Sequence, residues 1–212
     1  MHFSHNFLKL LSWLFVLLFA QSTGVLAMTD KATGIPFPSN LRDLNLFGVG
    51  VRKKGPIKIY AVGMYCSEAV RESLSAISRA TDKGKQAIAA LCSGAQDNPT
   101  SFVLKMNFKV GAEKMSSAIA ESVAPRHNVP SEVDELKSLI FSGVSEKGAA
   151  VKGTCLQFDC SPETGVDVSV DGKGQGNVAS PGLAKAFCNV YLDDKCVSPA
   201  LRESILSNCC AP

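Results

Sequence analysis

The sequence predicts an α+β fold, in which helices pack against one face of a largely antiparallel β-sheet. Strand-like segments occur early and late in the 212-residue chain, while helical spacing occupies its middle and its end. Strict alternation of strand and helix is not visible, which argues against a parallel sheet. Neither an internal repeat nor a low-complexity tract interrupts this order.

The first strands are predicted from apolar segments of high β-propensity. "LNLFGVGVR" (44–52) and "IKIYAVGMYC" (57–66) are joined by "KKGP", whose Gly55 and Pro56 supply the turn. A further strand is predicted over residues 100–110 because apolar and polar residues alternate there. Four apolar side chains share one side of it: Phe102, Leu104, Met106 and Phe108.

Helical spacing predicts four helices in the middle of the chain, over residues 68–80, 85–94, 112–126 and from 131 onward. Gly94 and Pro125 are expected to end the second and third of these helices. Ser131 is expected to open the fourth, with Asp134 in the capping-box position.

The last third of the chain predicts a strand pair followed by two helices. Residues 149–160 and 165–172 are expected to pair around "SPET", and "DGKGQG" (171–176) is expected to be a hairpin or connecting turn. Ser180-Pro181 and Ser198-Pro199 each place an N-cap residue before a proline at the first helical position.

The N-terminus has the three-part pattern of a secretory signal peptide over residues 1–27. Lys9 precedes the apolar run 10–20, and "VLA" (25–27) offers a cleavage site. The run is too short to span a membrane, and no stable membrane anchor is expected after cleavage. We therefore predict a signal peptide (1–27), an extended lead-in (28–40) and one domain (41–212), with entry into the ER lumen or secretion.

Composition excludes several classes of function. Removing residues 1–27 takes away one lysine and lowers the net charge from +3 to +2, which does not favour nucleic-acid binding. All eight cysteines follow residue 27 and could form up to four disulfides. However, no CxxC pair occurs, and the one histidine of this part, His127, is expected to be exposed in a Pro-bounded loop. No metal or other cofactor is therefore expected.

A cluster of cations, Arg52-Lys53-Lys54, leads directly into the apolar strand from residue 57. Such a charge at the end of a sheet can receive an anion. A solvated strand-end cation is the alternative for Arg52, and a core aromatic with its hydroxyl at the rim is the alternative for Tyr60.

Two segments resemble the chalcone isomerase-like family. The first joins G-x-G-x-R (Gly48, Gly50, Arg52) to "IYAVGMY" (59–65), and the second is "SPGLAKAFCNVYLDDKCVSPALRESI" (180–205). The resemblance runs from about residue 35 to the end of the chain. It implies an open-faced β-sandwich with a ligand cleft between sheet and helices, and it includes both true isomerases and non-catalytic relatives that bind fatty acids.

Position by position, the isomerase site is incomplete in this chain. Arg52 matches the family arginine, while Tyr60 stands where the isomerases have Thr. Met115 and Ser122 stand for the helix Tyr and Asn, and Ser180 matches the last hydroxyl position. Met115 has no proton to donate, so isomerase activity is not expected.

The fatty-acid-binding relatives pair the arginine with a tyrosine on the next strand, as Arg52 and Tyr60 do here. A carboxylate accepts two N–H bonds from a guanidinium and one O–H bond from a phenol. Seven residues separate the two, which implies a short hairpin and an altered cleft entrance. Eight apolar residues are available to line a tunnel: Phe47, Ile59, Met64, Phe102, Leu104, Met106, Met115 and Ile119.

We therefore expect a non-catalytic protein that binds a fatty acid or similar amphipathic carboxylate through Arg52, Tyr60, Met115, Ser122 and Ser180. One alternative is an isomerase-type enzyme that uses Arg52, Tyr60 and Ser122 in an intramolecular cyclisation. Another is an accessory protein that binds a polyketide intermediate. The resemblance also adds a second destination, an algal plastid reached by the secretory route.

Overall fold

Seven antiparallel strands form the central sheet, in the order β11-β10-β9-β6-β5-β4-β3. The computed structural model describes residues 28–212, the side chains of Thr81 and Lys83 excepted, so the predicted signal peptide lies outside the described residues. The strands are β3 (Asn40–Leu41), β4 (Leu44–Lys54), β5 (Ile57–Cys66), β6 (Thr100–Met106), β9 (Cys155–Ser161), β10 (Gly165–Val170) and β11 (Lys173–Val178). The predicted hairpins 44–66 and 149–172 are both present, and residues 173–178 extend the second as an edge strand.

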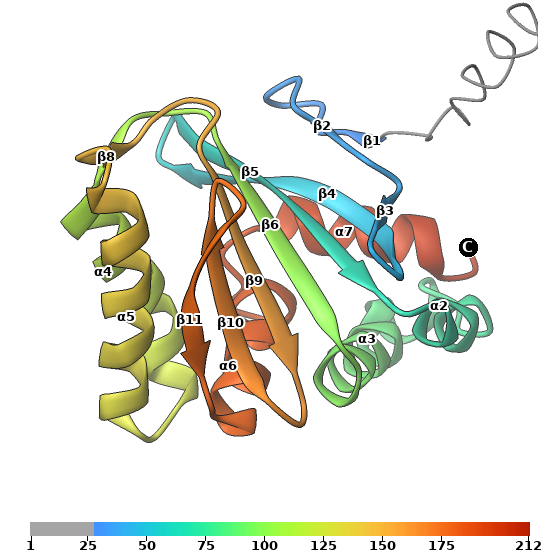
Figure 1. Cartoon of the computed structure of the whole chain (residues 1–212). Coiled ribbons are helices and arrows are strands. Elements are labelled where there is room, and N and C mark those ends of the chain that lie inside the picture. Colours follow the sequence, from blue (N-terminus) through green and yellow to red (C-terminus); the bar gives the residue numbers. More distant parts are fainter. Residues whose placement is uncertain (1–27) are drawn as a thin grey trace, which may run out of the picture.

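The helices cover one face of this sheet, as Figure 1 shows, and bury the larger hydrophobic cluster against it. They are α2 (Glu68–Ser75), α3 (Lys85–Asp97), α4 (Ala112–Val123), α5 (Pro130–Ser145), α6 (Pro181–Leu192) and α7 (Pro199–Cys209), with 3₁₀ turns η1 (Thr81–Gly84) and η2 (Ala124–Arg126). Two short pairs complete the fold, β1 (Met28–Thr29) with β2 (Pro36–Phe37) and β7 (Val110–Gly111) with β8 (Ala149–Ala150). The predicted α+β fold, an open-faced sheet layered with helices, is confirmed. None of the helices within residues 28–212 has the length and apolar character that crossing a bilayer requires.

Residues 28–41 lie across the outer face of the sheet, opposite the helices. A smaller hydrophobic cluster forms there: Phe37, Leu46, Val49, Ala61, Tyr65 and Val103. The Tyr65 hydroxyl donates to the Pro38 carbonyl at 3.1 Å, and Lys105 Nζ lies 4.7 Å from the centre of the Phe37 ring. The N-terminal segment thus covers part of the face that the helices leave free.

Several predicted element boundaries were wrong for identifiable reasons. The first helix ends at Ser75, not at residue 80, because Ser78 forms a bridge with Ala211 near the C-terminus. Gly94 does not end α3 but lies inside it, where a side chain would come within 2.7 Å of Val70 on α2. Here glycine permits two helices to pack closely.

Two further boundaries differ near prolines and loops. α5 begins at Pro130 with Val129 as its N-cap residue, so the predicted capping box at Ser131 does not form. Proline at the first helical position replaces it, because a proline needs no N–H partner there. The strand predicted over 100–110 ends at Met106, since the backbone then turns to bond Ile59.

The two Ser-Pro helix starts are confirmed. Ser180 Oγ accepts from Leu183 N at 3.1 Å at the start of α6, and Ser198 Oγ accepts from Leu201 N at 3.4 Å at the start of α7. The Ser198 hydroxyl also donates to the Val51 carbonyl at 3.0 Å. This bond attaches the N-terminus of α7 directly to β4.

The G-x-G pair allows α7 to lie against β4 without intervening side chains. A Cβ atom at Gly50 would stand 2.2 Å from Leu201 N, and one at Gly48 would stand 2.7 Å from Ile205 N. Real Cβ atoms do not approach backbone so closely, so these positions require glycine for space. As a result, the connection between α6 and α7 lies beside the next helix-facing residue of β4, Arg52.

Candidate functional site

Arg52 and Tyr60 stand directly opposite each other on β4 and β5. Directly paired residues of antiparallel strands share one face of the sheet, and Tyr60 belongs to the core beneath the helices. The register shifts immediately after this pair, toward the turn. Such bulges re-aim side chains and are frequent beside binding sites. The two residues predicted to hold an anion are therefore brought together.

Arg52 is half-buried, and most of its donors are unpaired. Its Nη1 atom donates to the Val197 carbonyl at 3.0 Å, in the connection between α6 and α7. Within residues 28–212, no carboxylate comes within ion-pair distance of it. A guanidinium carries five N–H donors, so this one retains donors for an external acceptor.

Tyr60 shares its hydrogen bond with a second buried tyrosine, Tyr191 of α6. The two hydroxyl oxygens lie 3.1 Å apart. Each hydroxyl carries one proton, and a bond between them uses only one. The pair therefore holds a second O–H donor inside the protein, next to a cation. A buried donor without an acceptor is costly, so this arrangement favours an incoming acceptor.

Burial raises the pKa of Tyr60, although the bond from Tyr191 and the charge of Arg52 both act to lower it. Burial also raises the pKa of Tyr191, well above its ordinary value. Both hydroxyls thus keep their protons at neutral pH. They can donate to an anion and do not themselves neutralise Arg52.

Aromatic and methionine side chains share the buried core with the tyrosine pair. The Tyr191 ring stacks on Phe102 with centroids 4.8 Å apart, and Phe187 lies one helical turn before it. Seven of the eight residues predicted to line a tunnel belong to the buried core, and Ile59 packs against it. Met64, Met106 and Met115 are among them, and methionine is the apolar side chain that adapts most readily to a changed neighbour.

Within residues 28–212, the other predicted site residues make no side-chain hydrogen bond to this pair. Met115 is buried in the same core cluster as Tyr60 and Tyr191, whereas the Ser122 hydroxyl donates to its own helix at the Ala118 carbonyl, at 2.8 Å. Ser180 begins α6 and Tyr191 lies eleven residues further on, about 16 Å along a helix. Ser180 therefore caps the helix and does not meet Arg52, because Tyr191 takes the position beside Tyr60.

Tyr191 is the site residue that the sequence reasoning missed. It stands inside the "VYLDD" motif that supported the family resemblance, but it was given no role. A signal was present, since a tyrosine on the apolar face of a helix needs a partner for its hydroxyl. The sequence does not show that this partner is the Tyr60 hydroxyl, because that depends on how α6 packs against β5.

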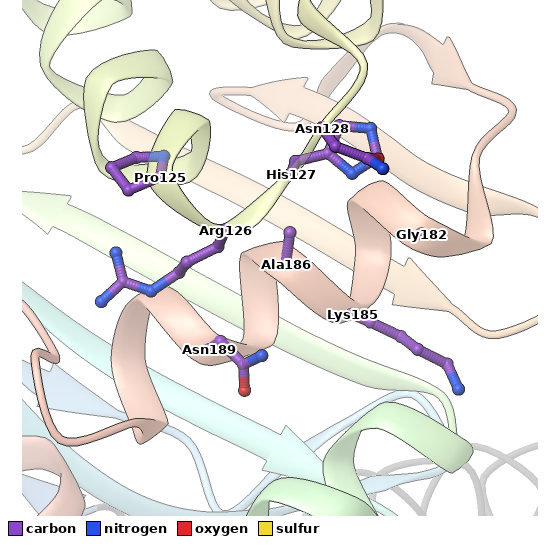
Figure 2. Close-up of a pocket in the computed structure, with 8 residues that line it drawn as sticks. All are labelled: Pro125, Arg126, His127, Asn128, Gly182, Lys185, Ala186 and Asn189. Atoms are coloured by element: carbon purple, nitrogen blue, oxygen red, sulfur yellow. The ribbon is translucent and has the colours of Figure 1, made fainter.

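A second candidate site is an open groove between η2 and α6, with a volume of about 580 Å³. Figure 2 shows Arg126 and Lys185 at its edges, extending away from each other. Arg126 makes a two-pronged ion pair with Asp193 at 2.7 and 2.8 Å. Lys185 Nζ lies 3.4 Å from Asp97 Oδ1, so both cations of the groove already have carboxylate partners.

His127, also in this groove, was predicted to be exposed, and that prediction was wrong. Its side chain is 6% exposed, and its Nε2 lies 2.6 Å from Glu132 Oε2. Bonds from Ser180 and His127 lower the pKa of Glu132. The N-terminus of α6 and the loop before α5 are thereby tied together. The groove's polar groups thus stabilise the fold and leave few donors for a ligand.

All eight cysteines are free thiols in the structure. Cys66 and Cys188 are buried, whereas Cys92 is partly exposed. Burial raises the pKa of Cys160 well above the ordinary value, which keeps that thiol protonated and unreactive. The part of the chain that the structure describes contains no group of three potential metal ligands.

Comparison with known proteins agrees with this architecture. A family model described as chalcone isomerase-like matches residues 31–207. The curated relative "Fatty-acid-binding protein 1" of Arabidopsis thaliana is 23% identical over 195 residues, covering 86% of this chain and 70% of the relative. A crystal structure of an Arabidopsis thaliana fatty-acid-binding protein superposes with a TM-score of 0.70 at 23% identity, covering 86% of this chain and 97% of that one.

The open-faced antiparallel sheet with its one-sided helical layer defines the class of fold. The chain belongs to the chalcone isomerase-like family, since the family match spans most of its length. The resemblance drawn from the G-x-G-x-R segment and the C-terminal motif is confirmed.

Proposed function

We propose that the protein binds a fatty acid, or a similar amphipathic carboxylate, without performing chemistry on it. The observation that carries this proposal is the juxtaposition of Arg52, which has no carboxylate partner within residues 28–212, with the buried hydroxyl pair Tyr60–Tyr191. The name of the Arabidopsis relative, a fatty-acid-binding protein, supports it.

A carboxylate matches the donors that the site leaves free. Its oxygens can accept two N–H bonds from the Arg52 guanidinium and the remaining O–H bond of the tyrosine pair. The anion would neutralise a half-buried cation whose side-chain partner in the part of the chain that the structure describes is the Val197 carbonyl. A neutral lipid head group offers no such neutralisation, which favours a free acid over an ester.

The aliphatic tail requires an apolar space between the sheet and the helices. The residues there are packed, with Phe102, Leu104 and Met106 fully buried. Entry of a tail therefore means displacement of side chains, and the three core methionines are suited to it because their thioethers rotate at little cost. Tail binding would then release contacts in the helix-covered core and replace them with ligand contacts.

The geometry does not favour the isomerase alternative. Ring closure needs donors that stabilise charge on a ketone, and Met115 supplies none at the position where isomerases have tyrosine. Ser122, the other residue of that alternative, bonds its own helix. Arg52 and Tyr60 by themselves suit the holding of an anion.

Mass spectrometry of small molecules released from the purified protein tests the proposal. We expect a stoichiometric fatty acid on the parent and none on Arg52→Ala. Arg42→Ala is the matched control, because the Arg42 side chain is 71% exposed and remote from the pair along the sheet. An empty parent that cyclises a chalcone would establish the enzyme instead. An empty and inert parent would favour the accessory, polyketide-binding protein.

Entry into the secretory pathway stays a prediction from residues 1–27. Sequencing the N-terminus of the protein isolated from its source tests it, since cleavage after Ala27 is expected. An intact N-terminus would contradict it, and a start well beyond residue 28 would favour the plastid route.

A further inference from the structure

A basic and apolar surface lies at the end of the sheet next to Arg52 and Tyr60. We call it the hairpin rim, and it consists of residues 51–60, 105–111 and 149–154, which meet at the upper left of Figure 1. Backbone bonds join the three segments. The Ile59 carbonyl accepts from Asn107 N and Phe108 N at 2.9 and 3.0 Å, and the β7–β8 pair links the other two.

Each segment of the hairpin rim exposes one large apolar side chain. Ile57 is 41% exposed, Phe108 is 47% exposed and Val151 is 39% exposed. These are three of the five large apolar side chains that are exposed within the described residues. Single exposed apolar residues are ordinary, but three on adjoining loops indicate an interaction surface.

The hairpin rim is also strongly basic. Its segments contain seven Lys and Arg residues and no Asp or Glu, although the whole chain has 19 acidic and 22 basic residues. Five of its lysines are exposed and pair with no carboxylate within residues 28–212: Lys53, Lys54, Lys58, Lys109 and Lys152. Of these, Lys58 donates to the Ala32 carbonyl.

Acidic side chains that follow these segments do not neutralise the surface. Glu113, at the start of α4, pairs with Lys137 at 2.8 Å. Asp171, at the β10–β11 turn, pairs with Lys147 at 2.6 Å. The positive charge of the hairpin rim is therefore available to an anionic partner.

We propose that the hairpin rim docks on the surface of an anionic lipid bilayer. Apolar side chains set among lysines suit the bilayer interface, where the apolar groups enter the boundary of the acyl chains and the lysines meet anionic head groups. A charged protein surface would satisfy the lysines but would leave Phe108 and its apolar neighbours against polar groups. The anionic bilayer is the partner that matches both the exposed apolar side chains and the lysines of the hairpin rim.

Docking in this way deepens the proposed function, and its use for ligand transfer rests on that function. Arg52 and Tyr60 lie on either side of the turn that carries Ile57. Met106 pairs with Tyr60, and Phe108 follows two residues later. In a docked protein, Arg52 and Tyr60 would thus lie next to the bilayer. An amphipathic carboxylate could then pass directly between the membrane and the protein.

Tryptophan fluorescence of the protein cleaved after Ala27 and carrying Phe108→Trp tests the docking. Trp13, the natural tryptophan, lies in the segment that is predicted to be removed, so the introduced residue is the reporter. We expect the emission to move to shorter wavelength with vesicles of phosphatidylcholine and phosphatidylglycerol, and not with phosphatidylcholine alone. Adding Lys53→Glu/Lys54→Glu should raise the lipid concentration at half-maximal shift about tenfold or more.

Two matched controls separate the hairpin rim from the rest of the surface. Val129→Trp places the reporter at a residue that is 37% exposed and lies at the other end of α5, a sixteen-residue helix, and no shift is expected. Lys85→Glu, combined with Phe108→Trp, reverses the charge of an exposed lysine on α3 and should leave the shift unchanged.

Parallel measurement of retained fatty acid distinguishes the two proposals. If the protein retains fatty acid but the emission of Phe108→Trp does not shift with anionic vesicles, the docking is overturned and the proposed function is still supported. A reporter that shifts on a protein without fatty acid would support the docking and contradict the proposed function. An equal shift with neutral vesicles, or in the Lys53→Glu/Lys54→Glu variant, would overturn the role of charge.

Discussion

Arg52 and Arg126 are two partly buried arginines whose surroundings differ in one decisive respect. Arg126 uses four N–H groups, two on Asp193 and one each on the carbonyls of Ser122 and Lys195. Within residues 28–212, Arg52 makes one side-chain hydrogen bond, to the Val197 carbonyl, and it lies beside two phenol oxygens. The comparison teaches that a buried arginine is a binding candidate when the protein leaves its donors free, and a structural element when the protein satisfies them.

The largest expected difference between the two arginines is in ligand affinity. Arg52→Ala should weaken fatty-acid binding by about 100-fold, because two charge-assisted bonds contribute about 3 kcal/mol. Arg126→Ala should leave the affinity unchanged within about twofold. Isothermal titration with palmitate measures both, and equal losses in the two variants would break the distinction.

Stability should show the reverse order. Arg126→Met should lower the free energy of unfolding by about 2 kcal/mol, since it removes the two-pronged bond and leaves Asp193 unpaired. Arg52→Met should cost less than about 1 kcal/mol, because it removes one bond to a carbonyl. Urea denaturation measures the two values. A larger loss for Arg52→Met would mean that Arg52 is itself structural.

The tyrosine pair should behave as a coupled unit. Tyr60→Phe or Tyr191→Phe should each cost about 1 kcal/mol of stability, because each leaves a buried hydroxyl without its partner. The double variant should cost less than the sum of the two, as no orphaned hydroxyl remains. Additive losses in the double-mutant cycle would show that the two hydroxyls do not depend on each other.

The smallest expected effect is a pH dependence of stability that the Arg126 pair produces and Arg52 does not. Burial acts to raise the pKa of Asp193, but the bonds and charge of Arg126 outweigh it and lower the pKa below its ordinary value of 3.8. The pair therefore stabilises the protein above pH 3.8, and this contribution is lost as the pH falls through the lower pKa of the folded state.

Unfolding of the parent and of Asp193→Asn between pH 7 and pH 3 measures this contribution. The difference between their free energies of unfolding should shrink in acid by less than about 1 kcal/mol, because a third of the Asp193 side chain is exposed. If this difference stayed constant from pH 7 to pH 3, the lowered pKa of Asp193 would be contradicted. Arg52→Met should show no convergence of this kind, since no carboxylate pairs with Arg52 in the described residues.

Local chemistry was sufficient to predict much of the fold. The Ser-Pro helix starts at residues 180 and 198 and the turn at Gly55-Pro56 depend on neighbouring residues, and each is where the sequence placed it. The predicted end of α3 was wrong because Gly94 is required for close packing against α2 and does not end the helix. No local sequence pattern reveals such a contact.

The candidate site was only half predictable for the same reason. Arg52 and Tyr60 meet because a short hairpin sets their register, and hairpin register can be read from a turn. Tyr191 joins them across 131 positions of sequence through the packing of a helix on a sheet. Ser180 was misplaced because its position in the motif gives no measure of the ten helical residues that separate it from Tyr191.

The most direct measurement is a crystal structure of the protein with palmitate bound. We expect carboxylate oxygens within hydrogen-bond distance of the Arg52 guanidinium and of a hydroxyl of the Tyr60–Tyr191 pair, with the tail between the sheet and the helices. A carboxylate in the groove beside Arg126 and Lys185, or a tail outside the helix-covered core, would contradict it.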